Sequence, residues 1–160
     1  MGLLLGYAFN TDKKFAVDPY GLGFGLRVGY ELDFKLFLGA GFEYFLGSSE
    51  TLQQAAGGIG LGREESSANY MFANVEAGYD FWFSDVIVRP SLWLGVGWVT
   101  IDPDPIANGK ATRSDFFWAP GASVLYVTDG LFIGGDVRWF MATGDGTPGL
   151  SIFVNGGLRF

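Results

Sequence analysis

The chain has 160 residues, of which 49% are hydrophobic and 18% aromatic, and its formal net charge is −7. It contains neither Cys nor His, which removes disulfides, thiolate chemistry and most nucleophilic and metal-dependent mechanisms. With 10 basic residues against 17 acidic ones, a phosphate-binding surface and a nucleic-acid partner are disfavoured. We expect no metal and no cofactor.

The apolar content, with a mean hydropathy of +0.25, exceeds that of an ordinary soluble domain. The longest uncharged runs, 116–128 and 146–158, are shorter than the roughly 20 residues that a membrane-spanning helix needs. Glycines recur as Gly-x-Gly inside the apolar runs, which disfavours helices but suits curved sheets. The composition therefore predicts an all-β protein.

Apolar and other residues alternate along eight segments, as expected for strands with one apolar face. In chain order the predicted strands are roughly 2–9, 22–32, 35–46, 70–83, 86–100, 116–128, 131–141 and 151–160. The connections alternate in length: short ones lie at 33, 84–85 and 129–130, and long ones at 10–20, 47–69, 101–115 and 142–150. Tight turns on one side and long loops on the other are typical of transmembrane barrels. We predict a single domain, residues 1–160, forming an eight-stranded antiparallel up-and-down transmembrane β-barrel.

One face of these strands carries no charge, as a lipid-facing surface requires. Tyr and Trp on this face cluster near the two ends of the strands, which is where membrane interfaces select them. The predicted interface aromatics are Tyr30, Tyr44, Tyr79, Trp98, Trp118, Tyr126, Trp139 and Phe160.

The opposite face collects glycines and charges. Because an eight-stranded barrel is filled by its own side chains, these charges are expected to pair inside it, with structural pairing favoured over substrate binding or catalysis. The predicted interior polar network is Arg27, Glu43, Glu76, Arg89, Asp136, Arg138 and Arg159. Inward glycines are expected to make room for the guanidinium groups.

Two prolines interrupt predicted strands. Pro90 and Pro120 each remove a donor from the hydrogen-bond ladder, so we expect a bulge or shifted register at both positions.

The last segment carries the most specific pattern. Val154, Leu158 and the terminal Phe160, together with the loop alternation and the two aromatic levels, resemble the small eight-stranded outer-membrane β-barrels of the OmpA-like and OmpX-like families. The resemblance covers the whole chain, although Asn155 stands where the family pattern has a glycine. The glycine-rich loops are also similar to those of myxobacterial-type outer-membrane β-barrel proteins.

The resemblance implies an integral, porin-like membrane protein of the Gram-negative outer membrane. Its partners would be the lipid bilayer and, during insertion, the barrel assembly machinery, and we expect a monomer. The termini would be periplasmic and the long loops extracellular. Since Met1 leads directly into the apolar pattern, we expect a form whose targeting segment has been removed.

The leading functional hypothesis is a structural or loop-mediated interaction role around a polar, side-chain-filled interior. A narrow channel for ions or small solutes is the first alternative. A soluble, lipocalin-like barrel for an apolar ligand would need the two faces reversed. An enzyme is least favoured, because the related outer-membrane lipases and palmitoyl transferases use a histidine that this chain lacks.

Overall fold

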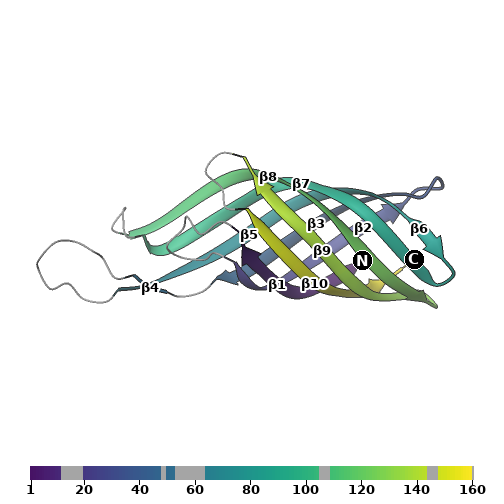
Figure 1. Ribbon diagram of the computed structural model, residues 1–160, viewed down its shortest axis with the longest axis horizontal. Coiled ribbons are helices and arrows are strands. Elements are labelled where there is room, and N and C mark those ends of the chain that lie inside the picture. Colours follow the sequence, from purple (N-terminus) through teal and green to yellow (C-terminus); the bar gives the residue numbers. More distant parts are fainter. Residues whose placement is uncertain (12–19, 48–49, 53–63, 105–108, 144–147, 160) are drawn as a thin grey trace, which may run out of the picture.

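Antiparallel pairing links each long strand to the next and returns from the last strand to the first, so the sheet closes on itself (Figure 1). The computed structural model describes residues 1–159 apart from 12–19, 48–49, 53–63, 105–108 and 144–147. Closure occurs where the first strand lies beside the last, with Leu5 opposite Val154. The predicted all-β, eight-stranded antiparallel barrel is confirmed.

The strands are β1 (Gly2–Asn10), β2 (Gly21–Glu31), β3 (Leu36–Gly47), β4 (Glu50–Leu52), β5 (Glu64–Tyr79), β6 (Phe81–Phe83), β7 (Val86–Asp104), β8 (Gly109–Thr128), β9 (Leu131–Ala142) and β10 (Gly149–Leu158). β6 continues the line of β5 along β7, so the two together form one of the eight strands of the barrel. β4 pairs only with the start of β5. No helix long and apolar enough to cross a membrane occurs among the described residues.

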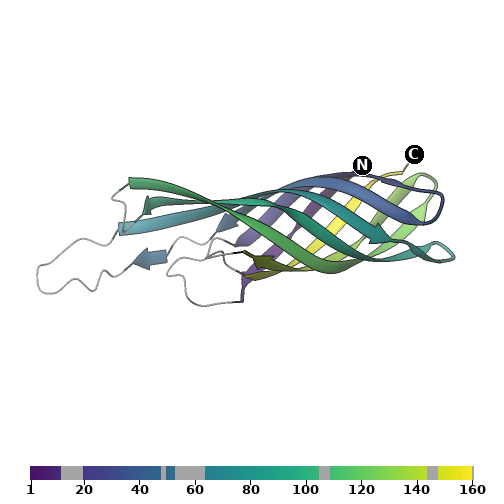
Figure 2. The same ribbon diagram turned by 90° about the horizontal axis from the view of Figure 1, so that it is seen from above.

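Three tight turns join strands at the end of the barrel where the described termini also lie (Figures 1 and 2). Asp129 and Gly130 have φ angles of 28° and 82°, and Ser84 has 56°. Positive φ at the central residues gives a hairpin turn whose twist matches that of the flanking strands, and Asp-Gly adopts it at little cost. We call this the short-turn end and the opposite one the loop end.

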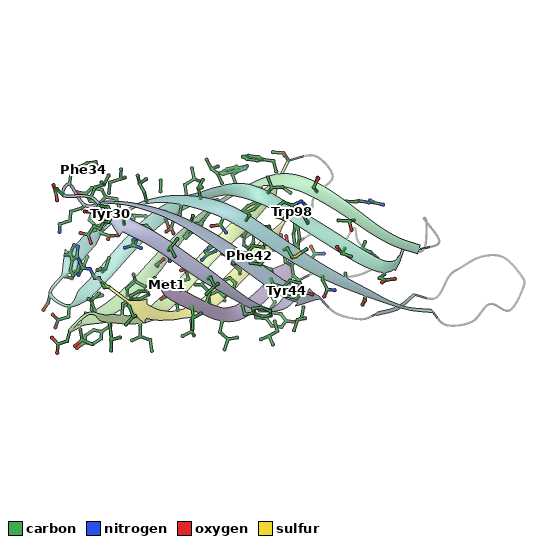
Figure 3. The ribbon with its side chains drawn as sticks, turned by 180° about the vertical axis from the view of Figure 1, so that it is seen from behind. Met1, Tyr30, Phe34, Phe42, Tyr44 and Trp98 are labelled. Carbon is green, nitrogen blue, oxygen red and sulfur yellow. The ribbon has the colours of Figure 1, made fainter. Side chains whose placement is uncertain are left out.

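Side chains alternate between an apolar outer face and a mixed inner face. On β1, β2, β3, β9 and β10 every outward position holds an apolar residue or glycine, and many of these side chains are about half exposed (Figure 3). Leu3 and Val154, for example, are 65% and 62% exposed. This arrangement is the reverse of a soluble ligand-binding barrel, which needs a polar exterior.

β7 and β8 run well past their predicted ends. With 19 and 20 residues they exceed the 9–11 that a tilted strand needs to cross a bilayer, and together with β5 they project beyond the other long strands (Figures 1 and 2). Thr100 faces Thr112 across this projecting hairpin, and their hydroxyls lie 3.3 Å apart. The prediction of a loop over 101–115 was therefore wrong for 101–104 and 109–115, and residues 105–108 lie outside the described part of the chain. The polar residues of this segment look like those of a loop. In a hairpin that extends outside the barrel, however, water can solvate both faces while the two strands keep their backbone hydrogen bonds.

The two strand prolines interrupt pairing without shifting it. At Pro90 the hydrogen-bond ladder between β7 and its neighbour is interrupted, which separates β5 from β6. The register is the same on both sides of the interruption. Pro120 leaves a similar gap between β8 and β9, again at constant register. The expected bulges were wrong because the missing donor costs one local step of the ladder, while the neighbouring ladder on the other side of each proline stays intact.

Candidate functional site

The lumen is layered along the barrel axis. An aromatic layer fills its loop half, an ion-pair network occupies its middle, and a cavity opens toward the short-turn end. The expectation of a polar interior throughout was too broad, because only the middle layer is a polar network.

The aromatic layer, here called the aromatic plug, consists of rings from five strands and from the residue preceding β2. Its members are Tyr20, Phe45, Tyr70, Phe72, Phe117, Phe140 and Phe153, each no more than 2% exposed. Phe72 lies at its centre, stacked on Phe140 with ring centroids 4.7 Å apart and edge-on to Phe117 at 4.5 Å. Such contacts add to the hydrophobic stabilisation of ring burial. The plug closes the loop half of the lumen.

Inward glycines receive these rings. A Cβ at Gly23 would meet the Phe45 ring at 2.7 Å, and one at Gly97 would meet Tyr70 at 2.6 Å. The predicted role of the glycines, making room for guanidinium groups, holds at Gly78, where a Cβ would meet Arg89 at 2.9 Å. Most of the space they free in the loop half is taken by aromatic carbon instead.

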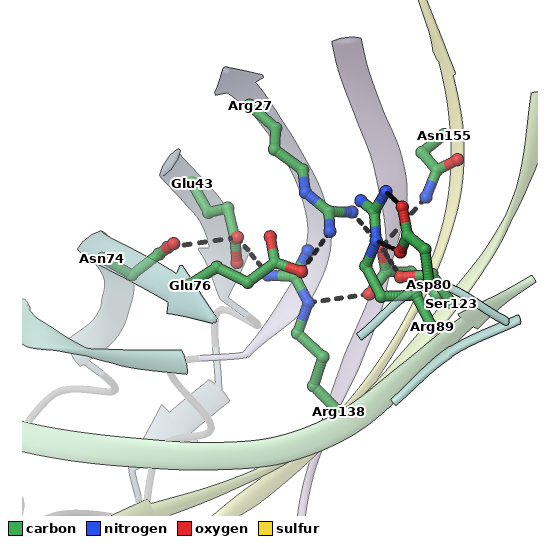
Figure 4. Close-up of polar contacts among 10 residues, drawn as sticks. Arg27, Glu43, Asn74, Glu76, Asp80, Arg89, Ser123, Arg138 and Asn155 are labelled. Carbon is green, nitrogen blue, oxygen red and sulfur yellow. Dashed lines mark hydrogen bonds and ion pairs between the residues drawn. The ribbon is translucent and has the colours of Figure 1, made fainter. Parts of the chain in front are cut away.

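Below the plug, five charged side chains form a continuous chain of ion pairs across the lumen (Figure 4). Its order is Glu76, Arg27, Asp136, Arg138 and Glu43. Arg27 donates to Asp136 at 3.0 Å and also contacts Glu76, while Arg138 donates to Asp136 at 2.9 Å and also contacts Glu43. All five side chains are at least nine-tenths buried.

Neutral polar groups complete this layer. Asn155, Ser123 and Asn74 donate hydrogen bonds to its carboxylates at 2.9, 3.2 and 3.3 Å. The Arg138 guanidinium lies 4.4 Å from the centroid of the Trp93 ring and 5.3 Å from that of Phe153, so it connects the network to the aromatic plug. Several buried polar atoms have no hydrogen-bond partner among the described residues, including Arg27 Nε, Glu76 Oε2 and Glu43 Oε2. Trapped water is the usual partner of such atoms.

A second ion pair lies next to this chain. Arg89 donates from Nε and Nη2 to the two oxygens of Asp80, at 2.5 and 2.7 Å. Its guanidinium lies 3.5 Å from the centroid of the Phe37 ring, which Arg27 also approaches at 5.1 Å. Asp80 was missed in the sequence, although strand parity places it inward between outward Tyr79 and Phe81.

Six of the seven predicted network residues thus lie in the buried middle layer, and Arg159 does not. Its side chain is 42% exposed at the short-turn end, where it donates to Glu31 at 3.1 Å and lies over the Trp82 ring at 4.5 Å. Parity alone gives the face of a residue and not its depth, and Arg159 follows the last residue of β10.

The short-turn end encloses a cavity of about 490 Å³, here called the short-turn cavity. Arg27 and Arg89 lie at its inner end and Glu31, Lys35 and Arg159 at its mouth. The apolar part of its wall is formed by Phe37, Ile87, Leu125, Val127 and Phe132. No group of three or more potential metal-ligating side chains occurs in the described part of the chain.

The predicted interface aromatics lie on the outside at two levels. Tyr30, Tyr79 and Tyr126 are 45–70% exposed near the short turns, and Trp118 and Trp139 are 40% and 46% exposed toward the loop end. Tyr44 and Trp98 are half-buried and lie toward the loop end (Figure 3). Phe160 lies outside the described residues.

No protein-family model and no curated protein sequence matches this chain. Solved structures do match over nearly its whole length. Neisserial surface protein A aligns with a TM-score of 0.69 at 12% identity, covering 99% of this chain and 94% of that one. A major outer membrane protein of Thermus thermophilus aligns with a TM-score of 0.63 at 10% identity, covering both chains fully.

The attachment invasion locus protein Ail of Yersinia pestis aligns with a TM-score of 0.61 at 17% identity, covering 99% of this chain and 94% of that one. At these identities the likeness concerns the fold, and one fold hosts different functions. The matched proteins are barrels of bacterial outer membranes, which supports an outer-membrane barrel here. The chain has the fold of the small eight-stranded outer-membrane β-barrels.

Proposed function

We propose that the protein is a monomeric integral barrel of the outer membrane, inserted by the barrel assembly machinery, with a structural or loop-mediated interaction role. Its termini face the periplasm and its loop end faces the outside. The observation that carries this proposal is the aromatic plug, which closes the lumen at the loop end. The loop end is therefore available as a surface for contacts and does not form the mouth of a pore. The uncharged outer band and the two levels of interface aromatics support the membrane assignment.

A channel role is the second candidate, and the polar middle layer is the observation that favours it. Its unpartnered buried atoms call for water, and the short-turn cavity extends that wet region toward one end. Phe72, Phe117 and Phe140 lie in the way of a continuous path, since their rings are in mutual contact and buried. We therefore expect little ion conductance and no passage of sugars.

The loop end determines which partners are plausible. The segments 10–20, 47–69, 101–115 and 142–150 together carry nine acidic and five basic residues. Ail has been crystallised with the heparin analogue sucrose octasulfate, a polyanion. The acidic excess here disfavours a polyanion and favours a cationic or neutral partner.

The protein is not an enzyme under this proposal. The buried carboxylates are tied to arginines in the middle of the lumen and covered by the plug, out of reach of a substrate at the loop end. The absence of His and Cys from the sequence removes the commonest nucleophile and base pairs.

Reconstitution into lipid vesicles tests the closed lumen. Vesicles carrying the purified barrel should take up no more disaccharide than empty vesicles. The double variant Phe72→Ala/Phe140→Ala, which trims the plug, should raise ion conductance above that of the parent. Steady disaccharide uptake by the parent would make the channel the first candidate.

Trimming the projecting hairpin tests whether the loop end serves an outside role. A variant that joins Trp98 to Ser114 through an Asn-Gly turn keeps the register of β7 and β8. We expect it to fold and insert as well as the parent, measured by heat-dependent migration in gels. Failure to fold would mean that the hairpin is needed for the stability of the barrel, and it would contradict a separate role for the hairpin at the outer surface.

A further inference from the structure

We propose that the short-turn cavity is a binding site for a small organic anion, with an oxyanionic head on an apolar body. The volume of about 490 Å³ lies within the range of ordinary ligand pockets. The mouth lies among the turns at the short-turn end, so a solute on that side can enter without crossing the barrel. This site is distinct from the loop end, and it stands whether or not the outside role is correct.

Two arginines supply the anion-binding chemistry. Arg89 uses Nε and Nη2 on Asp80, and no described residue accepts a hydrogen bond from its Nη1. Arg27, which lines the same cavity, has a buried Nε without a partner. Both side chains are held in place, being 5% and 7% exposed and lying over Phe37. A buried guanidinium with a spare donor is suited to an anionic oxygen, because the site is preorganised and shielded from bulk water.

The rest of the cavity fits a ligand with an apolar body. Phe37, Ile87, Leu125 and Phe132 form walls that a bare inorganic ion would leave unused. The charged side chains that line the cavity are Arg27, Lys35, Arg89, Arg159, Glu31 and Asp33, and three further carboxylates, Glu76, Asp80 and Asp136, pair with Arg27 and Arg89. An anion is therefore held by directed hydrogen bonds from a guanidinium and not by an excess of positive charge, while the apolar part of the wall contacts the body of the ligand.

The rim of the cavity is held together by paired charges. Lys35 and Arg159 share Glu31, at 3.2 and 3.1 Å, and both lie over the Trp82 ring. Glu31 also accepts a hydrogen bond from Trp82 Nε1 at 3.3 Å. Glu31 thus pairs with both cations of the rim, and Asp33 lines the same cavity, so the charged side chains at the mouth are balanced.

Ligand-detected ¹⁹F NMR on the barrel in phospholipid nanodiscs tests the site, with empty nanodiscs as the blank. The probes are 4-fluorobenzoate, 4-fluorophenyl phosphate and the uncharged 4-fluorobenzamide. We expect saturable broadening with at least one anion and binding of the amide weaker by about tenfold or more, since hydrogen bonds to charged groups are roughly twice as strong as neutral ones. The two anions report whether a carboxylate or a phosphate is preferred.

Two variants locate the binding. Val127→Trp fills the cavity from its wall and should abolish the broadening, whereas Val154→Trp, on the outer face, should leave it unchanged. The pair Arg89→Gln/Asp80→Asn removes the spare donor without orphaning a buried charge and should weaken anion binding about tenfold while sparing the amide. Heat-dependent gel migration checks that each variant folds. Absence of saturable binding, equal binding of anion and amide, or binding that survives Val127→Trp would each overturn the proposal.

Discussion

Replacing Arg138 by leucine should destabilise the barrel far more than the same replacement at Arg159. Arg138 is fully buried, donates to Asp136 and Glu43, and lies over two aromatic rings. Arg159 is a matched control, because it also pairs with a glutamate and lies over a tryptophan, but at 42% exposure.

The magnitude follows from what each substitution leaves behind. Without Arg138, Asp136 keeps Arg27, Ser123 and Asn155, whereas Glu43 keeps only the Asn74 amide at 3.3 Å. One buried carboxylate is then almost unpaired, which costs about 3 kcal/mol or more. Loss of an exposed pair at Arg159 costs below about 1 kcal/mol.

Urea unfolding in lipid vesicles, followed by tryptophan fluorescence, measures both effects. With a urea dependence of about 2 kcal/mol per molar, the midpoint should fall by about 1.5 M for Arg138→Leu and by less than about 0.5 M for Arg159→Leu. The double variant Arg138→Leu/Glu43→Leu should recover much of the loss, since it removes the orphaned charge. Equal midpoints for the two single variants, or no recovery in the double variant, would refute the assignment of a buried, coupled pair.

Three further outcomes are expected. The chain should fold only in detergent or lipid, as a heat-modifiable monomer, because its outer apolar band far exceeds the patch that a soluble monomer exposes, and a sharp monodisperse peak in detergent-free buffer would contradict this. Gly134→Ala should lower the free energy of unfolding in urea by about 1 kcal/mol or more, since its Cβ would meet the Val124 carbonyl oxygen at 2.0 Å, whereas neighbouring Gly135→Ala, with its nearest atom at 3.8 Å, should be nearly neutral. Asp80→Asn should destabilise the barrel by about 1.5–3 kcal/mol and Asp85→Asn, in an exposed turn, hardly at all, so similar urea midpoints would contradict the buried Asp80–Arg89 pair.

Strand number, strand faces and the short turns could be predicted from the sequence because each depends on local chemistry. Period-two alternation gives the face of every residue, and Asp129-Gly130 gives a hairpin turn. The same parity places Arg27 and Arg138 on the inside, where they lie. The face of the sheet on which a side chain lies therefore depends only on the local sequence.

Depth along the barrel could not be predicted in the same way. It depends on strand tilt and on the register between strands, which arise from closure of the whole sheet. For this reason Arg159 could not be separated from the buried charges, and the gathering of Phe72, Phe117 and Phe140 at one level was not apparent. Tyr20 was missed for a different reason, since it precedes the strand and belongs to a predicted loop.

The ion pairs that cross the lumen have a consequence for assembly. In the described interior, the first half of the chain, through β6, contributes three carboxylates and one arginine, and the second half, from β7 onward, contributes two arginines and one carboxylate. Arg27 and Asp136, 109 residues apart, can meet only when these halves come together. Contacts of such long range form late in folding, because they must follow the ordering of the chain between them. The interior charges of the two half-sheets are opposite in sign, −2 and +1, and therefore favour pairing of unlike halves at closure. Two first halves or two second halves would bury like charges against each other, whereas one of each leaves a net charge of only −1 in the lumen.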